Sequence, residues 1–273
     1  MREFAYINII IILMSMLMSS CGQNSQGDEE MTDANTYAVL DSRITQNKYN
    51  ANLMPRTIGL FLGDCKLELV YVPGGVLDSS EGKKSDEVPV YPYYIGKTEV
   101  TQSLWMEVMG YNPSIFRDDD YPVENVTYDE VVAFLQKINH QLRDYGHFRL
   151  PNDNEWIFAA NGGKRRSSTI YSGSDEFWEV AWIYENSSDH THRVAQKLPN
   201  ELGIYDMTGN VAEWCSDIFY DVEDLVNENQ GFHLYRGATW SSISSDAGIE
   251  TKSRKNLYPR SSQVGFRIVM DCE

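Results

Sequence analysis

The stretch Leu202-Gly-Ile-Tyr-Asp-Met-Thr-Gly-Asn-Val-Ala-Glu-Trp214 follows neither the period of a helix nor that of a strand. It sets two carboxylates, Asp206 and Glu213, among glycine and asparagine residues that favour turns. The chain after residue 161 is similar, with many Gly, Ser, Asn and Asp residues and no helical period. We therefore expect loops and short strands there, with one closing strand over Val264–Met270.

Regular structure is expected mainly before this stretch. Alternating or β-branched runs predict strands over Leu67–Val72 and Tyr93–Ile95. Helix-start and helix-stop residues mark three helices: Thr101 with Gly110, the capping box Thr127 with Glu130, and Asn152 with Glu155. The body of the chain is thus predicted to be one mixed domain with helices in its first half and loops in its second.

Composition places the chain among ordinary globular proteins. Its 273 residues are 42% hydrophobic and 23% charged, with a formal net charge of −17. This acidic balance, with a pI near 4.7, argues against binding to nucleic-acid phosphates or to anionic lipid. The sequence also has no His-Glu-x-x-His, Gly-x-Ser-x-Gly or Walker motif, so no standard catalytic residues are predicted.

Six motifs occur in order: Lys97-Thr-Glu-Val-Thr101, Tyr121-Pro-Val-Glu-Asn-Val-Thr127, Phe148-Arg-Leu-Pro-Asn-Asp-Asn-Glu-Trp156, Leu202–Trp214, Tyr235-Arg-Gly-Ala-Thr-Trp240 and Gly265-Phe-Arg267. In this order and spacing they resemble the formylglycine-generating enzyme family, also called the sulfatase-modifying-factor domain. The resemblance runs from about Lys66 to Met270. It implies an α+β fold of the variant C-type-lectin-like kind, loop-rich around a small antiparallel sheet.

The residues that would perform the family's oxidase chemistry are replaced. That chemistry uses two cysteines shortly after the Arg-Gly-Gly-Ser motif, because thiolates bind Cu(I). The resemblance places Ser242 and Ala247 at these two positions. A hydroxyl is a poor ligand for a soft metal and a methyl group is none. We therefore expect neither copper nor oxidase activity.

The resemblance also implies a structural Ca²⁺ on Leu202–Trp214, here called the central stretch. Carried over by position, Asp206 and Glu213 supply carboxylates, while Gly209 and Val211 supply backbone carbonyls. Hard oxygen ligands on a tight loop suit Ca²⁺. The alternative is a metal-free turn whose polar groups are satisfied within the protein.

A variable polar face is expected around Ser241–Arg260. Trp240, Ser242, Asp246 and Arg254 are predicted to line a groove that binds a glycan, a peptide or an envelope protein. The alternative is an ordinary solvated loop. The pair His190-x-His192 lies in a polar run, where an exposed loop is expected rather than a metal site.

The amino-terminal part is typical of a bacterial lipoprotein. A short apolar segment ends in Ser-Ser-Cys, so residues 1–20 are predicted as a signal peptide and Cys21 as the lipidated residue. Residues 21–64 are expected to form a tether and stalk, and residues 65–273 the domain. An acidic run close behind Cys21 resembles a surface-export signal, so we expect a cell-envelope protein, lipid-anchored in the outer membrane and exposed at the surface.

Three functions are compatible with these features. The favoured one is a non-catalytic, membrane-anchored binding or structural lipoprotein. The others are an enzyme of the same family with altered chemistry and a diversified ligand-binding protein of the lectin fold. Cys215 is expected to be a buried thiol. Cys65 and Cys272 flank the domain, so the sequence allows a disulfide between them.

Overall fold

The computed structural model describes residues 37–38, 56–78, 87–164, 168–219, 232–249 and 260–272, which all lie in one compact unit over residues 35–273. Cys21 and Arg254 lie outside the described residues. Among those that are described, no helix is long and apolar enough to cross a membrane.

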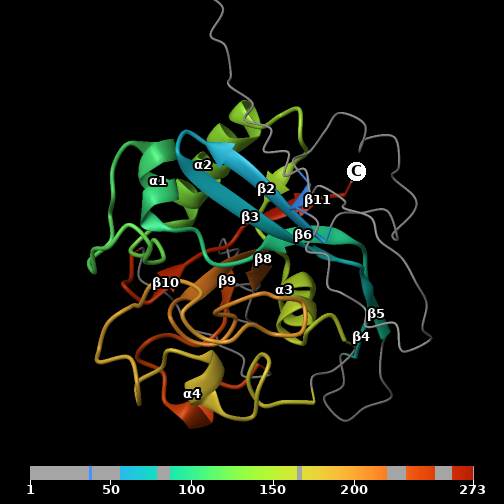
Figure 1. The fold of residues 1–273 in the computed structure, drawn as a ribbon, viewed down its shortest axis with the longest axis vertical. Helices are drawn as coiled ribbons and strands as arrows, with labels where there is room; N and C mark the ends of the chain where they lie inside the picture. Colours follow the sequence, from blue (N-terminus) through green and yellow to red (C-terminus); the bar gives the residue numbers. More distant parts are fainter. Residues whose placement is uncertain are drawn as a thin grey trace, which may run out of the picture. The chain divides into compact units, whose positions relative to one another are not determined.

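A six-stranded sheet forms the frame of the domain (Figure 1). Its order is β1 (Tyr37–Ala38), β2 (Thr57–Leu62), β3 (Cys65–Val72), β6 (Tyr93–Gly96), β11 (Val269–Asp271) and β7 (Phe148–Arg149). All neighbouring strands run antiparallel except β1 and β2, which are parallel. Because strand side chains alternate between faces, each central strand contributes to two separate cores.

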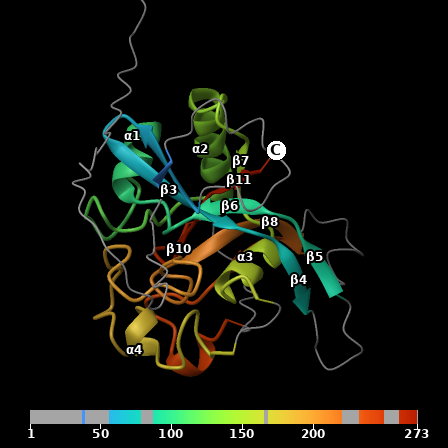
Figure 2. The same cartoon turned by 45° about the vertical axis from the view of Figure 1, so that its right-hand side comes forward.

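The two cores lie on opposite faces of this sheet. Leu69, Tyr94 and Met270 belong to the core that contains α1 (Gln102–Met109) and α2 (Tyr128–Gln141). Their chain neighbours Val70, Tyr93 and Val269 belong to the core that contains α3 (Asp153–Ala160). Figure 2 shows α1 and α2 on one side of the sheet and α3 on the other.

The three predicted helices are confirmed, and their caps form as expected. The Thr101 side chain accepts the N–H of Leu104, and Gly110 ends α1 with φ of 82°. The Thr127 hydroxyl accepts the N–H of Glu130 at 3.2 Å while Glu130 accepts the N–H of Thr127 at 2.9 Å. The Asn152–Glu155 pair has the same reciprocal pattern. These signals are local, so they do not depend on the rest of the fold.

The second half of the chain is dominated by loops, as predicted. Its regular elements are β8 (Ala212–Phe219), β9 (Phe232–Arg236), β10 (Val264–Gly265), the short helix α4 (Phe177–Val180) and the 3₁₀ turn η3 (Ser244–Asp246). Strands β10, β8 and β9 form a three-stranded sheet. In the first half of the chain, β4 (Gly75–Asp78) and β5 (Glu87–Val90) pair antiparallel as a separate two-stranded sheet. The arrangement confirms the α+β class.

The predicted single strand over Val264–Met270 is wrong. The segment forms two strands in different sheets, because β10 pairs with β8 whereas β11 pairs with β6 and β7. Residues 266–268 cross from one sheet to the other, and Arg267 there turns its side chain toward Glu213. Strand β2 also lies within the segment expected to be a stalk. It joins the sheet because its alternate residues Ile58, Leu60 and Leu62 are buried.

The cysteines of the described region are all unpaired. Cys215 is buried, as predicted. Strands β3 and β11 both run antiparallel to β6 and so point in the same direction. Cys65 begins β3 whereas Cys272 follows the end of β11, so the two thiols lie at opposite ends of the sheet. The terminal disulfide therefore does not form in this arrangement.

Two glycines with the same backbone angle provide a test of packing around the central stretch. Gly203 and Gly209 both have φ of +83°, but a Cβ on Gly209 would lie 2.2 Å from the Trp182 carbonyl oxygen, whereas one on Gly203 meets nothing within 4 Å. Gly203→Ala should lower the free energy of unfolding by about 1 kcal/mol through backbone strain alone. Gly209→Ala should lower it by roughly 2 kcal/mol or more beyond that, through overpacking. Urea unfolding measures both, and equal losses would contradict the packing described.

Candidate functional site

A buried ion pair fixes the central stretch. Strand β8 places the Glu213 carboxylate inside the domain, where Arg267 donates from Nε to Oε2 and from Nη2 to Oε1, both at 2.6 Å. The Trp156 indole N–H donates to Oε2 at 2.6 Å. The two charged side chains are at most 1% exposed. Burial alone would lower the pKa of Arg267, but the charge and hydrogen bonds of Glu213 hold it above its ordinary value.

The Arg267 guanidinium also joins separate parts of the chain. Nη1 donates to the Gly96 carbonyl at 2.9 Å and Nη2 to the Tyr205 carbonyl at 3.1 Å. One side chain therefore connects the end of β6, the central stretch and β8. A planar guanidinium with several donors suits this role, which a lysine would not fill.

Two further carboxylates lie near this pair with oxygens that have no partner. Asp206 sits in the left-handed region with φ of 57°, and its Oδ2 accepts the N–H of Ala195 at 2.7 Å. Its Oδ1 and both oxygens of Glu99 are buried without a hydrogen-bond partner among the described residues. Burial raises the pKa of Asp206 to about 6. Burial first, and then the charge of Asp206, raises the pKa of Glu99 well above its ordinary value.

The buried carboxylates are the groups that would hold the predicted Ca²⁺. Three carboxylates and one guanidinium leave a net charge of −2 when all are ionised, and the free Oδ1 of Asp206 is an available hard donor; both features suit a divalent cation. Glu213 is less available, because three of its roughly four acceptor positions are taken by Arg267 and Trp156. The described side chains include no set of three or more His, Cys, Asp or Glu placed to hold a metal. Calcium held by Asp206, Gly209, Val211 and Glu213 remains a prediction.

The raised pKa of Glu99 predicts a pH dependence of stability in the presence of a chelator. Below about pH 4.3, the pKa of a glutamate in the unfolded chain, Glu99 is protonated in both the folded and the unfolded state, so it does not change the free energy of unfolding. Above that value the unfolded chain releases the proton and the folded chain does not, so the free energy of unfolding falls as pH rises toward 8. Glu99→Gln, which cannot ionise, should flatten this fall in denaturant titrations between about pH 5 and pH 8. Glu68→Gln, at a half-buried ion pair, is the control; an unchanged slope in Glu99→Gln would contradict the assignment.

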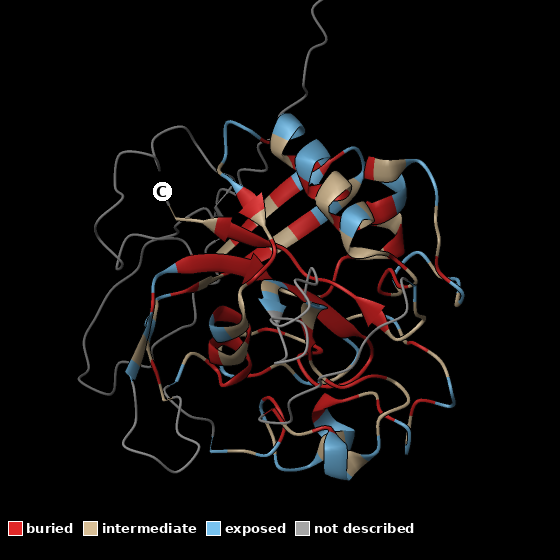
Figure 3. Ribbon diagram, turned by 180° about the vertical axis from the view of Figure 1, so that it is seen from behind, coloured by how far each residue is buried: buried red, intermediate tan, exposed pale blue. Residues whose placement is uncertain are grey.

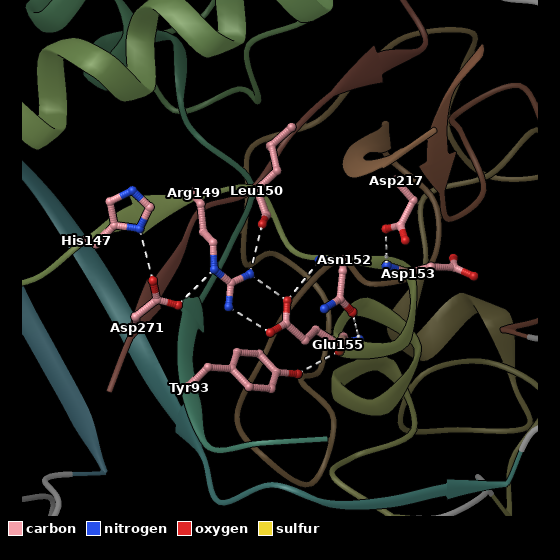
Figure 4. Close-up of polar contacts among 9 residues, drawn as sticks. All are labelled: Tyr93, His147, Arg149, Leu150, Asn152, Asp153, Glu155, Asp217 and Asp271. Carbon is pink, nitrogen blue, oxygen red and sulfur yellow. Dashed lines mark hydrogen bonds and ion pairs between the residues drawn. The ribbon is translucent and has the colours of Figure 1, made fainter. Parts of the chain in front are cut away.

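A second polar network explains the Phe148–Trp156 motif (Figure 4). Arg149 forms two hydrogen bonds with Glu155, at 2.7 and 2.8 Å, and one with Asp271 at 2.8 Å. His147 lies 2.9 Å from Asp271, and Tyr93 donates to the Glu155 carbonyl at 2.6 Å. These contacts tie the start of α3 to β6, β7 and the residue that ends β11. The motif is therefore structural, because each of its charged groups is paired within the domain.

The two positions of the family's cysteines are built into a turn and a small core. The Ser242 hydroxyl accepts the N–H of Thr239 at 3.0 Å and lies 3.2 Å from the Thr239 hydroxyl. No acidic or basic side chain of the described residues hydrogen-bonds to it. Ala247 is 2% exposed in a small apolar cluster, here called the satellite cluster: Tyr171, Val180, Ala181, Ile183, Ala238 and Ala247.

Trp240 stands on the same turn but is anchored rather than free. Its indole N–H donates to the Ser262 carbonyl at 3.0 Å, and its ring meets Phe116 edge to face at 5.5 Å. Phe116 in turn is held by Glu124, whose Oε1 accepts its backbone N–H at 2.9 Å. Half-buried Trp240 therefore helps to fix the turn, and only part of its ring is open to a ligand.

The predicted groove residues are brought together only in part. Trp240 and Ser242 lie on one turn, and Asp246 lies in η3 with its carboxylate exposed and 3.2 Å from the Ser245 hydroxyl. Arg254 lies outside the described residues. The groove remains a prediction.

The histidine pair is half-buried, and its expected exposure as a loop is wrong. His190 and His192 have ring centroids 4.4 Å apart, and His192 stacks on Trp182 at 3.8 Å. Each histidine has one ring nitrogen within 2.7 Å of a backbone carbonyl oxygen. The rings pack between Trp182 and Phe116 because stacking buries their faces.

Several residues of this site could not be assigned from sequence. Glu99 stood in the first motif and Arg267 in the last, but nothing local indicated that either lies beside Glu213. Trp182 stood outside every motif. The available signal was a charged residue inside an apolar run, which applies to Arg267 between Phe266 and Ile268; Glu99, between Thr98 and Val100, carried no such signal.

Known proteins share the class of fold described above. Residues 64–272 match the family described as "Sulfatase-modifying factor enzyme 1-like domain". The chaperone protein LppX of Paenibacillus barcinonensis is 32% identical over 251 residues, which cover 74% of this chain and 89% of that one. The inactive C-alpha-formylglycine-generating enzyme 2 of Bos taurus is 25% identical over 185 residues, 62% of this chain and 56% of that one.

A solved structure shows the same architecture. Treponema denticola variable protein 1 superposes with a TM-score of 0.68 at 26% identity, covering 80% of this chain and 99% of that chain. The chain belongs to the sulfatase-modifying factor enzyme 1-like family, and it has the α+β, C-type-lectin-like fold of that family. The resemblance drawn from the six motifs is confirmed.

Proposed function

We propose that this protein is a non-catalytic, membrane-anchored lipoprotein that uses its formylglycine-generating-enzyme-like domain for binding or for a structural role in the cell envelope. The strongest support comes from the contacts of the two residues that replace the family's cysteines. Ser242 stabilises a turn and Ala247 fills an apolar cluster, so neither presents a soft ligand or an activated nucleophile.

The relatives support a role without oxidase chemistry. One relative is named as an inactive formylglycine-generating enzyme and another as a chaperone protein. The likeness to a protein named as variable supports a second candidate, a diversified ligand-binding protein that uses the turn after Trp240. An enzyme with altered chemistry is disfavoured because Ser242 has no acid or base beside it among the described residues.

The purified protein should not convert cysteine to formylglycine. Incubated with copper, oxygen and a cysteine-containing sulfatase peptide, it should leave the peptide mass unchanged, because the Cu(I)–dithiolate site needs both soft ligands. An active member of the family provides the positive control. Loss of the thiol to an aldehyde would overturn the proposal.

The anchor makes a separate prediction. Cys21→Ala should move the protein from the membrane fraction to the soluble fraction, because the lipid chains would be attached through that sulfur. Cys65→Ala, which leaves the lipidation sequence intact, should remain with the membrane. Retention of Cys21→Ala in the membrane with an unchanged mass would contradict lipid anchoring.

We also propose that Ca²⁺ stabilises the central stretch through Asp206, Glu213 and the carbonyls of Gly209 and Val211. The buried Oδ1 of Asp206, a hard oxygen donor without a partner among the described residues, supports it. Replacing the chelator with Ca²⁺ should raise the free energy of unfolding at pH 8, since binding to the folded state adds stability by mass action. Asp206→Asn should abolish this gain, and no gain in the wild type would remove the metal from the account.

A further inference from the structure

The satellite cluster supports a second surface of the domain. Its residues come from α4, from the segments on both sides of it and from residues 238–247, which include η3. The elements are tied together: the Leu198 N–H donates to the Glu179 carbonyl at 2.8 Å, and the Tyr184 N–H donates to the Ser242 carbonyl at 2.9 Å. The Tyr171 hydroxyl donates to the Ser244 carbonyl at 3.1 Å. This end of the domain is thus one packed unit.

Large apolar side chains point outward from these elements. Trp178 is 55% exposed and Leu198 is 59% exposed, on neighbouring segments. The surface, here called the α4 face, consists of Ile170, Trp178, Tyr184, Leu198 and Ile243. In Figure 3 the short helix α4 is largely exposed. Exposed apolar side chains gathered on linked segments often mark an interaction site.

Most of the described charges around the α4 face are negative. Exposed carboxylates flank the apolar side chains on the same segments: Asp175, Glu176, Glu179, Glu185 and Asp246. Within residues 168–187, 197–199 and 241–249, all of which the structure describes, Lys197 is the only cation. It is turned over the Trp182 ring at 4.0 Å, and its ammonium donates to the Trp178 carbonyl. The described part of this surface therefore combines exposed apolar side chains with an excess of negative charge.

This combination selects among possible occupants. Anionic lipid and nucleic acid would be repelled by the carboxylates. A second copy of this chain would bring two acidic faces together, which like-charge repulsion disfavours. A polypeptide segment with both basic and apolar side chains satisfies both properties, since its apolar groups cover Trp178 and Leu198 while its cations meet the acidic rim.

We propose that the α4 face is a docking surface for a basic polypeptide segment that contains apolar side chains. This deepens the binding role proposed above and rests on it, because the α4 face shares Ile243 and the rim carboxylate Asp246 with the turn after Trp240. Trp178 supplies the anchor, because a large aromatic ring on a packed support binds with little loss of conformational freedom.

A labelled peptide in which lysines alternate with leucines and threonines tests this on the full chain. Fluorescence anisotropy should show binding that weakens as salt is added, because the rim charges are screened. The same peptide with glutamate for lysine, or with serine for leucine, should bind at least tenfold more weakly. Trp178→Ser with Leu198→Ser should weaken the original peptide roughly tenfold or more.

Two control variants separate this site from general attraction to an acidic protein. Phe61→Ser with Tyr91→Ser removes exposed apolar side chains elsewhere, at 61% and 79% exposure, and should leave binding unchanged. Glu176→Gln should weaken binding, whereas Asp144→Asn, at an exposed site on another element, should not. Melting temperatures of all variants should stay close to wild type, because the changed side chains are exposed.

The outcomes are distinct. Equal weakening in the α4-face and control variants would overturn the docking surface, and so would undetectable peptide binding by the wild type. If Trp240→Phe abolishes binding while the α4-face variant binds like wild type, the peptide uses the turn; the α4 proposal then fails and the proposed function stands. Formylglycine formation would overturn the proposed function without bearing on the α4 face.

Discussion

The buried pair of Glu213 and Arg267 is the interaction on which the loop-rich half of this domain depends. It joins a strand of the small sheet to the segment that crosses between the two sheets. Through the Gly96 and Tyr205 carbonyls, the same guanidinium also reaches the frame sheet and the central stretch. Removing one partner of such a pair leaves an unpaired buried charge, which costs about 3–5 kcal/mol.

Loops that lack regular hydrogen bonding need such polar anchors. The central stretch positions Asn210, whose carbonyl accepts the N–H of Trp240 at 2.8 Å and whose side chain bonds both backbone groups of His192. The turn that contains Ser242 is thereby linked to Glu213 through a few residues of chain. The scaffold can thus keep the family's shape while the cysteine positions have become structural. Binding on surface loops and on the α4 face then requires no change in the core.

What could be predicted from the sequence follows the range of the interactions. The helix caps at Thr101, Thr127 and Asn152 are local, so they were predicted correctly. The crossing at residues 266–268 depends on Arg267 meeting a carboxylate 54 positions away in the chain, so a single strand was expected there. The unpartnered oxygens of Glu99 and Asp206 are likewise set by packing. The replacement of the two cysteines could be predicted from the sequence, because it follows from the positions of the motifs. The structural roles of Ser242 and Ala247 follow only from their contacts in the folded domain.

A double-mutant cycle on the central pair tests this account most directly. Urea unfolding of wild type, Glu213→Gln, Arg267→Met and the combined variant measures the coupling between the two side chains. The account predicts that each single change costs about 3 kcal/mol or more, and that the combined variant loses at least about 2 kcal/mol less than the two single losses together. Losses that add within about 0.5 kcal/mol would show that the two side chains act independently and would contradict the account.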